Sequence, residues 1–467
     1  MKVIVMYCLH TLQPQQDNIV RRNPARTGPL ITPIVHFNEP TVTRFAGLVP
    51  LIRYLEDVLD LPNRLRIAIN QDVGRRTFPV HQVLFAFLVA ALAGVAKVAH
   101  LELLRGDRVI EKMLRLVRWP VRKVFSLALN GVTDTGVTGL VSLERDIGCA
   151  TFAKDETYVL NFDSSALIAY GEQEGALFGF CGWGRNRRRF NPVVASVGAT
   201  GAVVNSKFRD GSSLDAKQDE AFILETIETV AKRVAGKLAA IRADSGFWSL
   251  ALGNRLIALS IKFAIVLPMH PGVKLQLPLQ TYTPLDGDDD IELAEMSGAK
   301  VNLPASLRVI IIRRRVLDPK APPQGKVVQC DPNWRYQVVV TSLDWAPEDV
   351  WRFYNDRANI EHVFRDGKQS LGLDWLVSHD FRANEVAFHL RLIAYNADKS
   401  FQQAATATAI ADERKVIRAG VAFRQTRLYA LAGRLVNHGG SWVLRLAPNR
   451  LVRALMEFYA PDLVLAD

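Results

Sequence analysis

The chain has 467 residues, of which 49% are hydrophobic and 22% are charged. This length predicts two to three domains, and the composition excludes a mainly disordered protein. Lysine and arginine number 58 against 47 aspartates and glutamates, so the formal net charge is +11, which favours a polyanionic partner, nucleic acid before an anionic membrane.

The cysteines and the apolar runs indicate in which cellular compartment the protein lies. The four cysteines lie far apart, without the pairing of a zinc site, so we expect reduced thiols. The longest apolar run, residues 83–96, is shorter than the roughly 18 to 20 residues that span a bilayer. The first residues lack the features of a signal peptide. We therefore expect a cytoplasmic protein.

The first third of the chain predicts an arm followed by helices. Residues 1–40 are polar, basic and punctuated by prolines, which indicates an arm without a core of its own. Apolar residues then recur at helical spacing over residues 48–59, and a long helix is predicted over residues 83–104. We expect residues 41–150 to form a mostly helical N-terminal DNA-binding domain.

The pattern changes to strands near residue 157. Three β-prone runs follow one another and predict an antiparallel meander, at residues 157–162, 192–197 and 201–208. Helices and strands then alternate, at residues 219–237, 238–242, 248–259 and 262–267. This alternation is typical of an α/β fold.

The remainder of the chain predicts an insertion and a return to helices. Residues 268–347 have few helical signals, so we expect a β-rich insertion there. Helices resume after Pro347, and residues 401–467 are expected to form a C-terminal helical region. Gly439 and Gly440 predict a hairpin turn within it.

Two aspartates occupy similar positions in the predicted sheet. Asp163 and Asp244 each follow an apolar strand, and sheet ends are where α/β folds place their sites. A single aspartate in this position is more often a turn former or a helix cap. Two aspartates in matching positions, each after an apolar strand, indicate a functional site.

Four polar side chains share one face of the helix predicted after Pro347. At about 100° per residue, Tyr354, Arg357, Glu361 and Lys368 fall within about 60° of one another. This stripe suits a site in which Glu361 holds a metal while Arg357 and Lys368 contact phosphates. The alternative is a solvated face of ion pairs.

This stripe has the spacing Y-x2-R-x3-E-x6-K, and in it the chain resembles the DDE transposases of bacterial insertion sequences. Further blocks of the same family are similar to residues 162–165 with 170–176, to residues 209–212 and to residues 242–247. The resemblance covers about residues 157–396.

The resemblance implies a fold and a set of catalytic residues. The fold is an α/β ribonuclease-H-like (retroviral-integrase-like) catalytic core over residues 151–400, containing the β-rich insertion. The catalytic acids and metal ligands are Asp163, Asp244 and Glu361. They would hold two Mg²⁺ ions, with Mn²⁺ as an alternative.

The resemblance also implies a function. The protein would be a bacterial, cytoplasmic DNA transposase that binds the terminal inverted repeats of an insertion sequence as a homodimer. It would cleave the ends by metal-dependent hydrolysis and join the 3′-hydroxyls to target DNA, with a hairpin intermediate on the second strand. No nucleotide-binding loop is present in the sequence, so we expect no nucleotide cofactor.

Basic residues supply candidate DNA contacts. Beside Tyr354, Arg357 and Lys368, a cluster in the predicted loop between the first two core strands could clamp backbone phosphates, with the alternative of a solvated basic loop. This cluster consists of Arg185, Arg187, Arg188 and Arg189.

Three other functions remain open from the residues. A ribonuclease-H-like nuclease without strand transfer would use the same acids. A DNA-binding protein that has lost catalysis is disfavoured because all the acids are present. A membrane-surface protein is disfavoured because no basic amphipathic helix with a large apolar face is evident.

Overall fold

The computed structural model describes most of the chain beyond the N-terminal arm. The described residues are 39, 41–70, 78–181, 186–211, 216–316, 328–331, 333–409 and 413–464. The predicted arm at 1–40 therefore lies almost entirely outside the described residues. Everything from Pro40 onward belongs to one compact unit.

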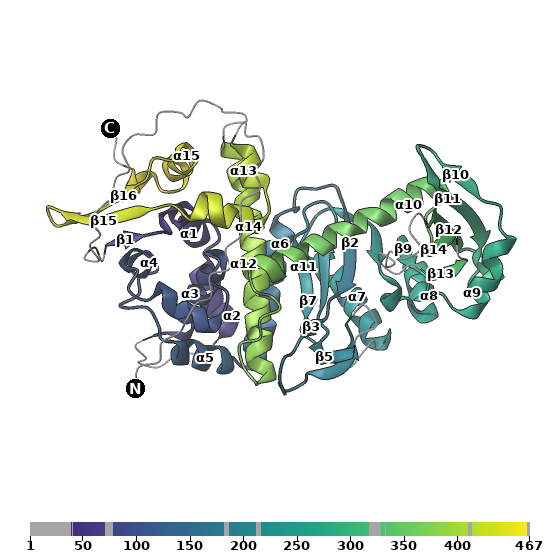
Figure 1. Cartoon of the computed structure of the whole chain (residues 1–467), viewed down its shortest axis with the longest axis horizontal. Coiled ribbons are helices and arrows are strands. Elements are labelled where there is room, and N and C mark those ends of the chain that lie inside the picture. Colours follow the sequence, from purple (N-terminus) through teal and green to yellow (C-terminus); the bar gives the residue numbers. More distant parts are fainter. Residues whose placement is uncertain are drawn as a thin grey trace, which may run out of the picture. The chain divides into compact units, whose positions relative to one another are not determined.

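A mixed sheet of ten strands is the largest sheet among the described residues (Figure 1). Its first three strands are an antiparallel meander, as predicted: β2 (Thr157–Ser164), β6 (Val193–Val197) and β7 (Val203–Lys207). The chain then forms α7 (Ala216–Ala231), β8 (Lys237–Ala243), α8 (Leu250–Ala258) and β9 (Phe263–Val266). The alternation is α/β because apolar strand runs end at turn residues and are followed by amphipathic helices.

The order of these strands defines the fold class. Across the sheet they run β7, β6, β2, β8, β9, and β8 and β9 are parallel to β2. The antiparallel strands β2, β6 and β7 lie on one side, and β8 and β9, which are parallel to β2, lie on its other side. This is the ribonuclease-H-like arrangement. The predicted fold is thereby confirmed.

The β-rich insertion extends this same sheet. Its strand β14 pairs antiparallel with β9, so the sheet grows to ten strands. The strands are β10 (Thr283–Leu285), β11 (Asp288–Ser297), β12 (Arg308–Arg315), β13 (Val328–Asp331) and β14 (Trp334–Thr341), and α9 (Pro271–Gln276) precedes them. The insertion is β-rich as predicted, and its strands continue the mixed sheet.

A small second sheet lies between β2 and β6 in the sequence. It consists of β3 (Leu167–Ile168), β5 (Asn186–Phe190) and β4 (Leu177–Phe180), in that order. The arginine cluster was predicted in a loop, but three of its members are in β5, which pairs on both sides. The prediction of a loop was wrong there because β5 pairs with β3 on one side and β4 on the other, and strand formation depends on such neighbours more than on intrinsic propensity.

The first helices of the chain are shorter than predicted. The helix predicted over residues 83–104 is α3 (Val80–Leu92), followed by a 3-10 segment at Val98–Leu104. The two are separated by Gly94, whose φ of +83° is outside the helical region. The other helices before the core are α1 (Val49–Arg53), α2 (Leu61–Ile69), α4 (Arg108–Met113), α5 (Arg122–Asn130) and α6 (Asp134–Ala150).

The N-terminal and C-terminal segments share one hydrophobic core. A single cluster of buried side chains runs from Phe45 through α3 and α12 (Phe381–Thr408) to Ala460. The C-terminal elements are α13 (Arg414–Arg418), α14 (Val421–Arg424), the predicted hairpin of β15 (Gly433–His438) and β16 (Ser441–Leu446), and α15 (Arg450–Tyr459). The hairpin pairs with β1 (Val42–Thr43) near the start of the chain.

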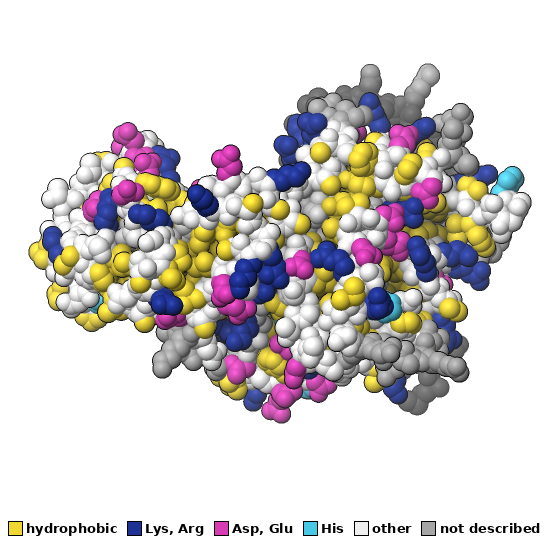
Figure 2. Space-filling view, turned by 180° about the vertical axis from the view of Figure 1, so that it is seen from behind, with side chains coloured by type: hydrophobic (Ala, Val, Ile, Leu, Met, Phe, Trp, Pro, Cys, Tyr) yellow, Lys and Arg dark blue, Asp and Glu magenta, His cyan; other side chains and the backbone are white. Residues whose placement is uncertain are grey.

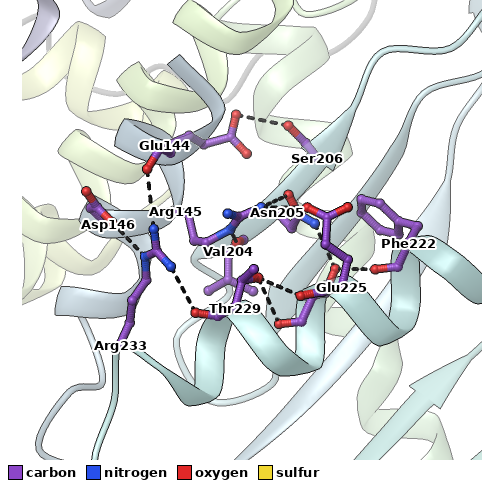
Figure 3. Close-up of polar contacts among 12 residues, drawn as sticks. Glu144, Arg145, Asp146, Val204, Asn205, Ser206, Phe222, Glu225, Thr229 and Arg233 are labelled. Atoms are coloured by element: carbon purple, nitrogen blue, oxygen red, sulfur yellow. Dashed lines mark hydrogen bonds and ion pairs between the residues drawn. The ribbon is translucent and has the colours of Figure 1, made fainter. Parts of the chain in front are cut away.

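Polar contacts connect α6 to β7 of the mixed sheet (Figure 3). The Arg145 guanidinium donates from Nε to the Val204 carbonyl oxygen at 3.2 Å and from Nη2 to Oδ1 of Asn205 at 2.6 Å. Ser206 donates from Oγ to Glu144 at 2.9 Å. Because these groups are buried and partnered, they fix the helix against β7.

Among the described residues, no single helix is both long and apolar enough to cross a membrane. The helices α5 and α6 pass that test of length and composition only as a pair, across a bend of 96°.

Candidate active site

Asp163 and Asp244 lie side by side at one edge of the sheet. Asp163 is the second-last residue of β2, and Asp244 directly follows β8. Because β2 and β8 are parallel neighbours and Phe162 lies opposite Ala243, the following residues emerge together. Asp244 also caps a short 3-10 helix, accepting a hydrogen bond from the Ser245 backbone N–H at 2.5 Å.

The environment of Asp163 disfavours its charge overall. Burial raises its pKa, the Arg357 guanidinium lowers it, and the neighbouring Asp244 carboxylate raises it again, with a net upward shift. This combination of a desolvated carboxylate, a second carboxylate and one cation is typical of sites where charge is used in chemistry.

Arg357 is the cation of this site. It donates from Nη1 to Oδ2 of Asp163 at 3.0 Å and from Nε to the Tyr354 hydroxyl oxygen at 3.2 Å. Its side chain is 13% exposed and that of Asp163 is 16% exposed. Burial raises the pKa of Tyr354 to about 12, so the hydroxyl stays protonated at neutral pH.

The segment that carries these residues is broken into three pieces. The single helix predicted after Pro347 is α10 (Pro347–Asn355), a 3-10 turn at Asp356–Ala358 and α11 (Asn359–Ser370). The prediction of one continuous helix was wrong because the local hydrogen bonds tighten at the turn that carries Arg357.

Lys368 fixes α11 to the segment that follows β2. Its Nζ donates to the Ser165 hydroxyl oxygen at 2.7 Å and to the Ala166 carbonyl oxygen at 3.1 Å. Burial lowers its pKa, and the nearby Asp374 and Asp163 oppose that shift. Tyr354, Arg357 and Lys368, three of the four residues predicted to share one stripe, therefore lie at the same end of β2 as Asp163.

Glu361 is exposed in the first turn of α11. Within the described ranges, no group of three or more His, Cys, Asp or Glu side chains is placed to hold a metal ion. The structure thus brings Asp163 and Asp244 together and leaves Glu361 outside the pair. The two carboxylates, side by side at a sheet edge, offer the oxygen ligands that a hard divalent cation prefers.

The arginines of the predicted clamp lie in different environments. Arg185 lies outside the described residues. Arg187 is exposed, and Arg188 lies over the ring of Phe178 at 5.3 Å. Arg189 is only 6% exposed, and its guanidinium fills the space where a side chain at Gly179 would be. Arg189 therefore supports the small sheet, while Arg187 and Arg188 face solvent fully or in part.

Arg242 is a site residue that the sequence reasoning did not identify. It is buried, donates from Nε to Oδ1 of Asn161 at 2.7 Å and from Nη1 to the Phe353 carbonyl oxygen at 2.5 Å. Burial lowers its pKa to about 10. It joins the two parallel strands to the end of α10, just before Tyr354. The sequence signal that could have identified it is an arginine inside an otherwise apolar predicted strand.

The sequence matches one known protein family. The family model for the transposase DDE domain matches residues 155–397, a range that contains every acid of the site. No curated protein sequence matches the chain.

Two solved structures are similar to the chain. One is a piggyBac transposase synaptic complex with hairpin DNA, 11% identical, with 83% of this chain and 81% of that chain covered and a TM-score of 0.41. The other is a Drosophila P element transposase strand transfer complex, 16% identical, with 51% and 45% covered and a TM-score of 0.21.

Proposed function

The chain belongs to the transposase DDE domain family, and from that premise we propose that it cuts the ends of a bacterial insertion sequence and joins them to target DNA. The observation that carries this proposal is the parallel pairing of β2 with β8, which sets Asp163 beside Asp244. Two adjacent carboxylates next to a buried cation suit phosphodiester chemistry.

Transposases of this family depend on a divalent metal, and we propose Mg²⁺, or Mn²⁺ in its place. Asp163, Asp244 and Glu361 would hold two ions, which when bound activate the attacking water or 3′-hydroxyl and stabilise the leaving oxygen. Glu361 lies four residues after Arg357, one helical turn further along the same segment. A movement of that segment would therefore act on both residues.

The other side chains of the site would bind and orient DNA. Arg357 and Lys368 are cations beside the aspartates, suited to contact the phosphates that flank the scissile bond. Tyr354 offers a protonated hydroxyl that can donate to a phosphate oxygen. Among the described members of the arginine cluster, Arg187 and Arg188 on β5 are accessible and would contact the DNA backbone further away.

The substrate and the assembly follow from this reaction. We propose double-stranded DNA with terminal inverted repeats as the substrate, with a homodimer bringing two ends together. The protein would act in the bacterial cytoplasm, where such DNA lies.

The test is a cleavage and joining assay with labelled DNA carrying the ends of the element that encodes the chain, in the presence of Mg²⁺. Wild type should cleave and join, whereas Asp163→Asn, Asp244→Asn and Glu361→Gln should bind DNA without cutting it. The matched control is Glu348→Gln on the neighbouring helix α10, which should keep full activity.

Other outcomes of this assay support the alternatives. Cleavage by wild type without joined products would favour a nuclease that lacks strand transfer. DNA binding without cleavage by wild type would favour a non-catalytic protein. Cleavage that survives Glu361→Gln would show that Glu361 is not the third acid.

A further inference from the structure

A polar pocket lies beside the long helix α12. It has a volume of about 410 Å³ and is lined by the end of α6, the turn between β6 and β7, α12 and the end of α13. Its lining consists of two cations, three threonines and two glutamines, and it shares no residue with the site around Asp163. Pockets for small ligands have volumes of roughly 300 to 1,000 Å³, so a small molecule fits in this one.

The two cations of the pocket are Lys399 of α12 and Arg418 at the end of α13. Within the described part of the chain, no carboxylate forms an ion pair with either cation, and no acid lines the pocket. Lys399 is half-buried and lies over the Tyr395 ring at 5.7 Å, while Arg418 is exposed. Two cations that line one cavity without an acid favour the binding of an anion between them.

The acid next to Lys399 in the chain is already neutralised. Asp398 is fully buried, forms an ion pair with Arg424 and accepts a hydrogen bond from the Tyr429 hydroxyl at 2.7 Å. Burial lowers the pKa of Lys399, with Arg424 acting in the same direction, while Asp398 and Asp366 oppose that shift. The fold alone therefore disfavours the charged form of Lys399, whereas an anion bound in the pocket would stabilise it.

The backbone on both sides of Arg418 is held in place. The Ile417 carbonyl oxygen accepts from Nε2 of Gln402 at 2.9 Å and from Nη1 of Arg424 at 3.0 Å. The Ala419 carbonyl oxygen accepts from the same two side chains. Because the residues before and after Arg418 are fixed beside the pocket, less conformational freedom is lost when a ligand binds there.

Uncharged groups of the lining offer further hydrogen-bond donors. Thr151 donates its hydroxyl proton to the Gly148 carbonyl oxygen at 2.8 Å, and Thr200 Oγ1, which accepts from the backbone N–H of Ala202 at 3.2 Å, carries a proton of its own. Gln403 donates from Nε2 to the Thr151 carbonyl oxygen at 3.1 Å, and its amide carries a second N–H. Both Thr200 and Gln403 can therefore donate to the oxygens of an anion.

This arrangement of charge differs from that of the surface elsewhere. On the face shown in Figure 2, Lys and Arg side chains lie interspersed with Asp and Glu side chains. Exposed cations form local ion pairs, such as that of Lys232 with Glu228 at 2.5 Å and that of Arg453 with Glu457 at 2.9 Å. The pocket instead combines its cations with hydroxyl and amide groups, which are the usual partners of a bound anion.

We propose that this pocket binds a small phosphate monoester, with the phosphate held between Lys399 and Arg418. A phosphate monoester carries about two negative charges at neutral pH and three acceptor oxygens, which match two cations and the neighbouring hydroxyl and amide donors. The volume of the pocket leaves room for an organic part beside the phosphate. The inference goes beyond the proposed function, because it uses no residue of the active site and requires no cleavage of DNA.

The test measures binding of inorganic phosphate and of glycerol 3-phosphate to the full chain by phosphorus NMR, without metal and at constant ionic strength. Arg418→Gln and Lys399→Met should each raise the dissociation constant of both probes about tenfold or more, because each removes a charged hydrogen-bond donor. Arg418→Lys keeps the charge and should bind within about threefold of wild type. Thermal unfolding without ligand checks that each variant is folded.

The matched control is Lys415→Gln. Lys415 is an exposed cation on the same helix as Arg418 and does not line the pocket, so its loss should change the dissociation constant less than about twofold. Equal weakening in Lys415→Gln and Arg418→Gln would show an effect of net charge alone and overturn the proposal. A wild-type protein that binds neither probe would overturn it as well.

A second comparison separates the pocket from the active site. Arg357→Gln removes a cation that the proposed function assigns to DNA phosphates, and it should leave binding of both probes unchanged. Loss of binding in Arg357→Gln with normal binding in Arg418→Gln would place the anion in the active site and overturn the proposal.

Competition identifies the source of the phosphate. A DNA duplex of mixed sequence should not displace glycerol 3-phosphate, and displacement that is lost in Arg418→Gln would assign the pocket to a backbone phosphate of DNA and overturn a small ligand. Cleavage of DNA is measured separately with Mg²⁺. If wild type binds the probes through the pocket but never cuts, only the proposed function fails; if it cuts DNA but binds neither probe, only the pocket proposal fails.

Discussion

Arg357 donates a hydrogen bond to Asp163 at 3.0 Å, although 194 residues separate the two in the chain. The same guanidinium interacts electrostatically with Asp244. The charge that compensates the aspartate pair in this structure therefore comes from the chain itself. A divalent cation binding to Asp163 has to compete with that arginine for the same carboxylate.

This competition predicts the behaviour of Arg357→Gln. Loss of the guanidinium leaves two neighbouring carboxylates uncompensated, so the metal-free protein should lose about 1 to 3 kcal/mol of stability. Added Mg²⁺ or Mn²⁺ should raise the melting temperature of the variant more than that of wild type, because the ion replaces the missing charge. Thermal unfolding with and without metal measures both effects.

The matched control for that measurement is Arg352→Gln. Arg352 lies on α10 and pairs with Glu348 at the surface, so its loss should change stability by less than about 0.5 kcal/mol. Its metal response should equal that of wild type. An identical metal response in Arg357→Gln would show that the arginine and the ion do not share Asp163.

Glu361→Gln should separate catalysis from stability. The side chain is exposed at the first turn of α11, so its neutral isostere should leave the melting temperature within about 1 °C of wild type. Cleavage of labelled DNA should fall at least a hundredfold because a metal-binding charge is removed. A loss of activity accompanied by a large fall in stability would instead assign Glu361 a structural role.

Part of this site could be predicted from the sequence because its signals are local. Asp163 and Asp244 each end an apolar run, and the spacing of Tyr354, Arg357 and Lys368 places them on one stripe. The break at Asp356–Ala358 was not predicted, since a 3-10 turn has no strong sequence signal there. Glu361, the fourth residue of the predicted stripe, is exposed in the helix that follows this break.

The remainder depends on contacts between distant segments. The pairing of Arg357 with Asp163 and the burial of Arg242 both require the sheet to be assembled first. The joining of β14 to β9 and of β1 to β15 likewise unites segments that are far apart in the chain. Periodicity reports which face of an element is buried and does not report which segment buries it.

The buried pair of Asp398 and Arg424 should be essential for stability. Both side chains are fully buried and ion-paired, and the Tyr429 hydroxyl donates to Asp398 at 2.7 Å. Asp398→Ala leaves the guanidinium uncompensated and should cost about 3 to 5 kcal/mol. The double variant Asp398→Leu with Arg424→Met should be more stable than Asp398→Ala. Urea unfolding measures both, and a cost below about 1 kcal/mol for Asp398→Ala would contradict the prediction.

Lys399 on α12 should make the free energy of unfolding depend on pH in the alkaline range. Burial lowers its pKa in the folded protein, with Arg424 acting in the same direction and Asp398 opposing it. The folded state therefore releases this proton before the unfolded state does, so stability should rise with pH between the lowered pKa and about 10.5. Lys399→Met should be more stable than wild type at pH 7, and this advantage should shrink toward pH 10.5. Lys232→Met, at an exposed position, should show neither effect.

Gly148 should tolerate no side chain, because α6 crosses β7 at closest approach there. A Cβ at this position would lie 2.0 Å from the Val203 carbonyl oxygen and 3.1 Å from Nδ2 of Asn396. Asn396 itself bonds both the N–H and the carbonyl of Val203, at 2.8 and 2.7 Å.

Gly148→Ala must therefore push the helix away from the sheet, and it should cost about 2 to 3 kcal/mol despite the better helix propensity of alanine. Thr138→Ala, at an exposed position of the same helix, should change the free energy of unfolding by less than about 0.5 kcal/mol. Because β7 belongs to the catalytic sheet, the Gly148→Ala variant should also stop cleaving DNA at temperatures at which wild type remains active. Equal stability of the two variants would show that α6 can shift without disturbing the sheet.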